Sequence, residues 1–79
     1  MSQANENNKE LLTNLGNKIR KCRQEQNLSQ EELAFRIDSA RNFIGCIERA
    51  EKSPTIITLY RIAQALNITL EALVSEIEP

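Results

Sequence analysis

The chain has 79 residues, which is enough for one compact domain but too few for two. Apolar residues make up 41% and charged residues 27%, as is typical of globular domains and not of disordered chains. No apolar run approaches the ~20 residues of a membrane span and the first residues lack the features of a signal peptide, so we expect a cytoplasmic protein with no membrane partner. The sequence has no histidine, and Cys22 and Cys46 fit neither a disulfide framework nor a metal-ligand spacing. We therefore expect reduced thiols and neither metal nor cofactor.

The net charge of −1 argues by itself against a nucleic-acid partner, because most DNA-binding domains are basic. The charge is, however, unevenly distributed. Residues 18–52 carry eight basic and six acidic side chains, a net of +2, whereas residues 1–17 sum to −1 and residues 53–79 to −2. A basic middle segment is compatible with a DNA contact in that part of the chain.

The first helical pattern is an apolar stripe formed by Leu12, Leu15, Ile19 and Cys22. It predicts one amphipathic helix that ends near Gln26. Cys22 is expected to be a small core residue. Residues 1–8 are polar, so we expect a flexible tail there and a folded domain over 9–79. Asn27 is placed to end the helix, because Asn tolerates a left-handed backbone.

The start of a second helix is the strongest local signal in the sequence. Ser29 is a good N-cap and Glu32 completes a capping box with it, while Leu28 and Leu33 are spaced as a hydrophobic staple. This helix is short and ends at residues 38–40. A third helix is expected after it, where apolar spacing resumes at Ile44 and Ile47. The inner faces of the second and third helices are expected to hold Leu33, Ala34, Ile37, Ile44 and Ile47.

Two further helices complete the expected fold. Thr55 can cap a fourth helix with an inner face of Ile56, Leu59, Ile62, Ala63 and Leu66. Thr69 can cap a last helix that runs to about Ile77. No segment shows the alternation typical of strands, so the sequence predicts an all-α fold of five helices.

Two short helices joined by a tight turn and packed on another helix form the arrangement that presents a helix to the DNA major groove. On a helical wheel Ile44, Ile47 and Glu48 face inward, whereas Asn42, Cys46 and Arg49 face outward, with Arg41 beside them. Arg can donate two hydrogen bonds to the edge of guanine, and Asn can form two hydrogen bonds with the edge of adenine. We therefore expect Arg41 and Asn42 to set sequence specificity; the alternative is an ordinary solvated helix face.

Two other side chains of this helix allow more than one interpretation. Phe43 lies at the flank of the outward face, where it either contacts a thymine methyl or sugar edge or closes the core. Cys46 points outward and either touches bases weakly or acts as an oxidisable switch beside arginine side chains.

At these residues the sequence resembles the phage repressor and Cro-type helix-turn-helix family. The resemblance covers about residues 11 to 75 and rests on the segments LSQEELA (28–34), IGCIER (44–49), SPT (53–55) and IAQALNI (62–68). It implies a compact five-helix, lambda-repressor-like domain with the helix-turn-helix at the second and third helices. Within the family, Arg41, Phe43 and residues 44–45 and 47–49 look most like the controller proteins of restriction-modification systems.

The resemblance also implies roles for individual side chains. Base contacts are expected from Ala40, Arg41, Asn42, Phe43 and Cys46. Phosphate contacts are expected from Ser29, Gln30, Arg49 and Lys52. The family often pairs an arginine late in the first helix with a glutamate near the end of the third, and those positions hold Arg23 and Glu48; the alternative is that both are free surface charges.

The sequence departs from the family around the third helix. Asp38 replaces a common Gly, Ser39 replaces an apolar residue, Ala40 replaces the usual N-cap, and Ala50 replaces the common Gly after the helix. Losing the cap should cost about 1 kcal/mol unless Ser39 caps one residue earlier, and that shift would re-aim Arg41.

The last helix is more apolar than a core of this size requires. We expect Leu70, Leu73, Val74 and Ile77 to form the two-fold interface of a homodimer, the alternative being a monomer in which all four pack inward. Two recognition helices about 34 Å apart would read a pseudo-palindromic DNA operator.

The favoured interpretation is a dimeric transcriptional regulator that represses or activates a promoter by its position relative to RNA polymerase, which would be a further partner. The alternative is an antitoxin-like or anti-regulator module that binds another protein. An enzyme is a third class, but the sequence has no histidine, no Gly-rich phosphate loop and no Cys/His or Ser/His pairing that would make a nucleophile.

Overall fold

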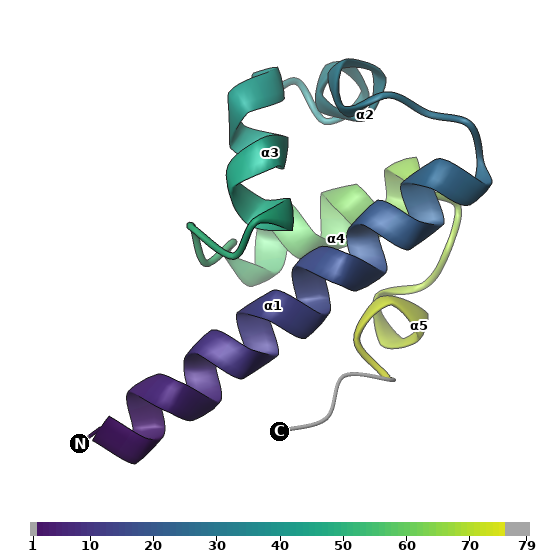
Figure 1. Ribbon diagram of the computed structural model, residues 1–79. Coiled ribbons are helices and arrows are strands. Elements are labelled where there is room, and N and C mark those ends of the chain that lie inside the picture. Colours follow the sequence, from purple (N-terminus) through teal and green to yellow (C-terminus); the bar gives the residue numbers. More distant parts are fainter. Residues whose placement is uncertain (1, 76–79) are drawn as a thin grey trace.

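The computed structural model describes residues 2–75, and within that range it contains five α-helices and no strand (Figure 1). The helices are α1 (Ser2–Glu25), α2 (Gln30–Arg36), α3 (Arg41–Glu48), α4 (Ile56–Ala65) and α5 (Leu70–Val74). The predicted all-α class and the order of five helices are confirmed. None of these helices is long and apolar enough to cross a membrane, over the part of the chain that the structure describes.

The first helix reaches the start of the described residues. α1 begins at Ser2, so residues 2–8 are helical, while the flexibility expected of residues 1–8 stays a prediction. Each residue added to an existing helix gains one hydrogen bond. A polar segment can therefore be helical when it directly precedes helical turns that pack against the core. The first turns of α1 extend away from the other helices (Figure 1).

One hydrophobic core receives side chains from all five helices. Its buried members are Leu15, Ile19, Leu28, Leu33, Ala34, Ile37, Ile44, Ile47, Ile62, Ala63, Leu66 and Leu73. Cys22 and Leu59 are half-buried and pack against it. Ile56 does not join this core, contrary to the prediction, because no other part of the described chain covers that side of the first turn of α4, and its side chain is 64% exposed.

The start of each predicted capped helix is confirmed. The hydroxyl oxygens of Ser29, Thr55 and Thr69 accept hydrogen bonds from backbone N–H groups in the first turns of α2, α4 and α5. In α2 the Glu32 carboxylate also accepts from the Ser29 N–H at 2.8 Å, which completes the capping box. These bonds use backbone donors that the first turn of a helix otherwise leaves unpaired.

Four of the helices end in a left-handed residue, and none of these residues is glycine. Asn27, Asp38, Ala50 and Asn67 have φ between 56° and 62°. After α3, the N–H of Ala50 donates to the carbonyl of Ile47 at 3.0 Å and the N–H of Glu51 donates to that of Cys46 at 2.8 Å, the pair of bonds of a Schellman motif. Asn and Asp tolerate this backbone, but Ala pays the steric cost of its Cβ there.

Candidate nucleic-acid interface

The turn between α2 and α3 is short and sets the start of α3. Asp38 takes the left-handed conformation with φ 56°, and the N–H of Ser39 donates to the carbonyl of Ala34 at 2.8 Å. Ala40 is the N-cap of α3 and makes no side-chain capping bond. The helix therefore begins at Arg41, and Ser39 does not shift its start.

α3 has one buried and one exposed face. Ile44 and Ile47 are buried in the core, while Arg41 and Asn42 are exposed on the outside and Cys46 is half-buried. This is the orientation that the helical wheel predicted. α3 stands at the edge of the molecule beside α2 (Figure 1), so its outer face is open to a large partner.

Phe43 is half-buried and packs against the core, which supports the core-closing interpretation of this residue. The Nζ of Lys52 lies 5.9 Å from the centre of the Phe43 ring. A lysine over an aromatic face is attracted by the ring quadrupole. The contact holds a cationic side chain from the loop after α3 beside the flank of α3.

The carboxylate of Glu48, at the end of α3, is the centre of a buried polar network. Its side chain is 1% exposed and accepts hydrogen bonds from Arg23 Nε at 2.7 Å and Arg23 Nη2 at 3.0 Å. Gln30 Nε2 donates to the same carboxylate at 3.0 Å, and Arg20 Nε lies 3.6 Å from it. Arg23 Nη1 also donates to the carbonyl of Leu28 at 2.8 Å. The pair that the resemblance implied is therefore present, and the network joins α1, α2 and α3.

The electrostatics of this network keep Glu48 ionised. Burial by itself raises the pKa of Glu48, but the hydrogen bonds from Arg23 and Gln30 and the charges of Arg23 and Arg20 outweigh it and hold that pKa below its usual value. Among the described residues, no buried side-chain nitrogen or oxygen lacks a hydrogen-bond partner. The angle of α3 is thus fixed by satisfied polar contacts as well as by core packing.

The four expected phosphate-contacting side chains lie at two places. Ser29 and Gln30 lie at the start of α2, where the Ser29 hydroxyl is used in capping and the Gln30 amide donates to Glu48. A primary amide has two N–H groups, so Gln30 keeps one for a phosphate. Arg49 and Lys52 follow α3, and Arg49 Nε pairs with Glu51 at 2.9 Å. A phosphate must compete with Glu51 for Arg49, whereas Lys52 is exposed.

A family model described as "Helix-turn-helix" matches residues 19–73, which include the whole of α2, the turn and α3. The chain belongs to the helix-turn-helix family. This agrees with the geometry, because the matched region contains both the two-helix unit and the helices that support it.

Similar proteins include control proteins of restriction-modification systems. The helix-turn-helix chain is 41% identical over 64 residues to control protein C.MunI of Mycoplasma sp, covering 80% of this chain and 86% of that one. The crystal structure of the restriction-modification controller protein C.AhdI of Aeromonas hydrophila is similar with a TM-score of 0.76 and 32% identity, over 78% of this chain and 90% of that chain. The controller protein C.Esp1396I, solved as a tetramer with its natural 35 base-pair operator, gives a TM-score of 0.74 and 34% identity, over 85% of this chain and 93% of that chain.

The sequence interpretation missed two residues of α1 that position the recognition helix. A Cβ on Gly16 would lie 2.6 Å from the carbonyl oxygen of Glu48 and 2.7 Å from that of Ile47, so only glycine allows α1 to approach α3 this closely. Arg20 Nη2 donates to the Glu48 carbonyl at 3.0 Å. The signal was the spacing, because Gly16, Arg20 and Arg23 follow one another at helical intervals of four and three residues.

The expected dimer residues of α5 do not form one exposed surface. Leu73 is fully buried in the core of its own chain and has no surface for a partner, so its assignment to the interface is corrected. Leu70 is half-buried, Val74 is 37% exposed, and Ile77 lies outside the described residues. α5 contributes its most apolar side to the core of its own chain, because a domain of this size needs each helix to bury apolar surface.

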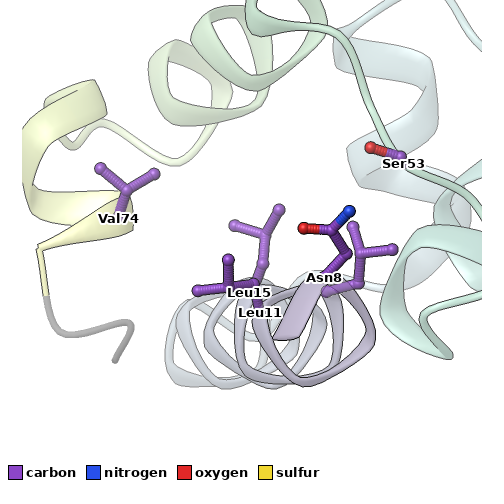
Figure 2. Close-up of a pocket in the computed structure, with 6 residues that line it drawn as sticks. Asn8, Leu11, Leu15, Ser53 and Val74 are labelled. Carbon is purple, nitrogen blue, oxygen red and sulfur yellow. The ribbon is translucent and has the colours of Figure 1, made fainter. Parts of the chain in front are cut away.

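A groove of about 520 Å³ lies between α1, α5 and the loop after α3, and it is lined by Asn8, Leu11, Leu12, Leu15, Ser53 and Val74. Figure 2 shows Val74 of α5 facing Leu11 and Leu15 of α1 across this space. Its lining contains no titratable side chain, so no acid or base among these residues could activate the hydroxyl of Ser53. Over residues 2–75, no cluster of three or more His, Cys, Asp or Glu side chains is placed to hold a metal ion.

Proposed function

We propose that this protein is a sequence-specific DNA-binding transcriptional regulator of the restriction-modification controller type, which binds a pseudo-palindromic operator as a homodimer. The observation that carries this proposal is the outer face of α3, where Arg41 and Asn42 are exposed while Glu48, at the other end of the helix, is tied to Arg23 and Gln30. A rigidly held helix with free polar groups on its outer face suits direct reading of base edges.

In this proposal the side chains of the site divide between two tasks. Arg41 donates a two-point contact to guanine O6 and N7, and Asn42 pairs with adenine, each contributing about 1 to 3 kcal/mol of discrimination. Ala40, Phe43 and Cys46 contribute smaller apolar contacts along the same helix. Ser29, Gln30, Arg49 and Lys52 contact phosphates on either side, which fixes the register of α3 in the groove without reading sequence.

The regulator acts in the cytoplasm on a promoter, where its position relative to RNA polymerase determines repression or activation. A homodimer presents two copies of α3 to two half-sites one helical turn apart. The similarity to C.Esp1396I, a controller solved with its operator, supports an operator as the ligand. The proposal needs no cofactor and no catalytic step.

The proposal is tested by selection from a pool of random duplex DNA. The purified protein is incubated with the pool at two salt concentrations, and the retained fragments are sequenced. We expect enrichment of a two-fold symmetric site and an affinity that falls steeply with salt, because phosphate contacts release counterions. If no sequence is enriched at either salt concentration, the regulator proposal is wrong and the protein-interaction module becomes the better account.

A further inference from the structure

The side chain of Arg49, which follows α3 directly, is held in one orientation by Glu51. Arg49 Nε donates to Glu51 Oε2 at 2.9 Å, and Arg49 Nη2 donates to Glu51 Oε1 at 3.3 Å. These two bonds join one side of the guanidinium to both carboxylate oxygens, a two-point contact that fixes the plane of the group as well as its position. Arg49 Nη2 also donates to Cys46 Sγ at 3.8 Å. The guanidinium therefore has a defined place beside the last turns of α3.

The backbone at the end of α3 brings Glu51 alongside Arg49. Residues two apart on a helix do not face each other. Here the left-handed Ala50 reverses the chain, and the N–H of Glu51 donates to the carbonyl of Cys46 at 2.8 Å. The Glu51 side chain thus starts from a fixed backbone that lies back against α3. The ion pair follows from the way the helix ends.

Gly45 leaves the space in which this guanidinium lies. A Cβ at position 45 would lie 2.9 Å from Arg49 Nη1, too close for both groups to keep their places. Because glycine has no Cβ, the guanidinium can lie against the backbone of α3. Arg49 follows Asn42 by seven residues, so both fall on the outer face of the helix. The Arg49 guanidinium therefore lies on the face of α3 that is proposed to meet DNA.

The pair with Glu51 limits what Arg49 can offer to a phosphate. A guanidinium has five N–H groups, and Glu51 uses one on Nε and one on Nη2. A DNA phosphate can take this two-point fork only by displacing Glu51, but it can accept from Nη1 while the pair stays intact. The hydrogen bond from Arg49 lowers the pKa of the Glu51 carboxyl, so at neutral pH the carboxylate is ionised and offsets the arginine charge. Arg49 is thus a directed donor and not a freely moving cation.

A directed donor and a mobile cation affect DNA binding differently. Binding to DNA of any sequence depends on phosphate contacts, and a long mobile cation can follow a phosphate in many registers. A guanidinium fixed in one orientation meets a phosphate well only when the DNA lies in one register on α3. Holding the side chain in place therefore weakens binding to unrelated DNA more than binding to the correct site.

We infer that Glu51 is a positioning residue that makes DNA binding more selective, because it prevents Arg49 from acting as a mobile cation and directs Nη1 at one phosphate of the correctly seated complex. The inference rests on the proposed function, since it requires α3 to bind DNA through its outer face. Both side chains of the pair are 54% exposed, and exposed ion pairs contribute little to the stability of a fold. The effect of Glu51 is therefore expected on DNA binding and not on folding.

The test measures fluorescence anisotropy with two labelled duplexes, the selected operator and a duplex that lacks it, over a range of salt concentrations. We expect Glu51→Gln to strengthen binding to the unrelated duplex at least about threefold, and to change operator binding by less than about twofold. On the unrelated duplex, the slope of log affinity against log salt should become steeper by about 0.9, the value for one further phosphate contact. Glu71→Gln removes the same charge from an exposed position on α5 and should change neither this slope nor the ratio of the two affinities.

A second variant shows whether the effect passes through Arg49. When Arg49→Ala is already present, Glu51→Gln should no longer steepen the salt slope, because the cation that it would release is gone. Circular dichroism verifies that each variant is folded. The inference is overturned if folded Glu51→Gln keeps the ratio of operator to unrelated affinity of the wild type, if it weakens operator binding more than about twofold, or if its effect persists without Arg49.

The same measurements separate this inference from the proposed function. If the wild type prefers the operator and Glu51→Gln prefers it equally, only the role of Glu51 is wrong. If the wild type binds both duplexes equally, the proposed sequence-specific function fails, and the inference fails with it.

Discussion

Arg23 of α1 joins Glu48 of α3 by two hydrogen bonds, from Nε at 2.7 Å and from Nη2 at 3.0 Å, with both side chains almost fully buried. The contact links the long first helix to the end of the recognition helix. Removing one partner leaves the other charge buried and unpaired, which is costlier than the net worth of the pair.

We therefore predict that Arg23→Ala lowers the free energy of unfolding by about 3 kcal/mol, although Gln30 and Arg20 still contact Glu48. Urea denaturation measures the loss. The double variant Arg23→Leu with Glu48→Leu should recover part of it, because no unpaired charge then remains. A single variant as stable as the wild type would show that the pair does not hold α3.

The lowered pKa of Glu48 predicts how stability depends on pH. Above the ordinary glutamate pKa of about 4.5 the carboxylate is ionised in both states and the network contributes fully. As pH falls through 4.5 the unfolded chain takes up the proton first, so stability is lost progressively down to the lower pKa of the folded protein. In urea denaturation between pH 7 and pH 3, Glu48→Gln should show a shallower loss than the wild type, and equal slopes would contradict this assignment.

The close contact of α1 with α3 makes Gly16 a sensitive position. Gly16→Ala places a Cβ against backbone carbonyl oxygens that cannot move alone, so we expect a net loss of about 1 to 3 kcal/mol despite the better helix propensity of alanine. Gly45→Ala is the matched control, because a Cβ there meets the end of the flexible Arg49 side chain. Thermal denaturation should show a marked loss for position 16 and little change or a gain for position 45; a reversal of this order would mean that α1 and α3 do not approach this closely.

The backbone of Ala50 is strained, and substitution by glycine should relieve that strain. Its φ of 62° is left-handed, a conformation that costs a non-glycine residue about 1 to 2 kcal/mol. We expect Ala50→Gly to raise the unfolding free energy by about 1 kcal/mol, since the gain is reduced by the greater flexibility of glycine in the unfolded chain. Asn67→Gly has a similar φ but should gain less, because asparagine already tolerates it. A destabilised Ala50→Gly variant would contradict the left-handed end of α3.

The sequence predicted local features well because they depend on neighbouring residues. The capping box of Ser29 and Glu32 and the left-handed end at Asn27 follow from side-chain chemistry within a few positions. The pair of Arg23 and Glu48 came from the family resemblance. The helical form of residues 2–8 was not predicted, because polarity alone does not separate an irregular segment from the continuation of a helix.

Features that depend on distant contacts were harder to predict. Nothing local shows that Gly16 faces backbone oxygens of α3, or that Gln30 donates to Glu48. Leu73 was expected at an interface but is buried in the core, and Ile56 was expected in the core but is exposed. The reason is the same, since an apolar residue at the edge of a helical stripe can lie either in the core or at the surface.

The most direct test of the central claim is the base preference of Arg41. The wild type, Arg41→Ala and the control Lys9→Ala are each selected against random duplex DNA at one salt concentration. Lys9 is exposed on α1, and Lys9→Ala removes the same charge from a helix that is not assigned to base reading. We predict a symmetric site for the wild type and for Lys9→Ala, and for Arg41→Ala the same site relaxed at one base pair in each half, with a loss of about 1 to 3 kcal/mol in affinity for the original site. An Arg41→Ala variant that matches the wild type in both sequence preference and affinity would contradict the assignment of α3 as the base-reading helix.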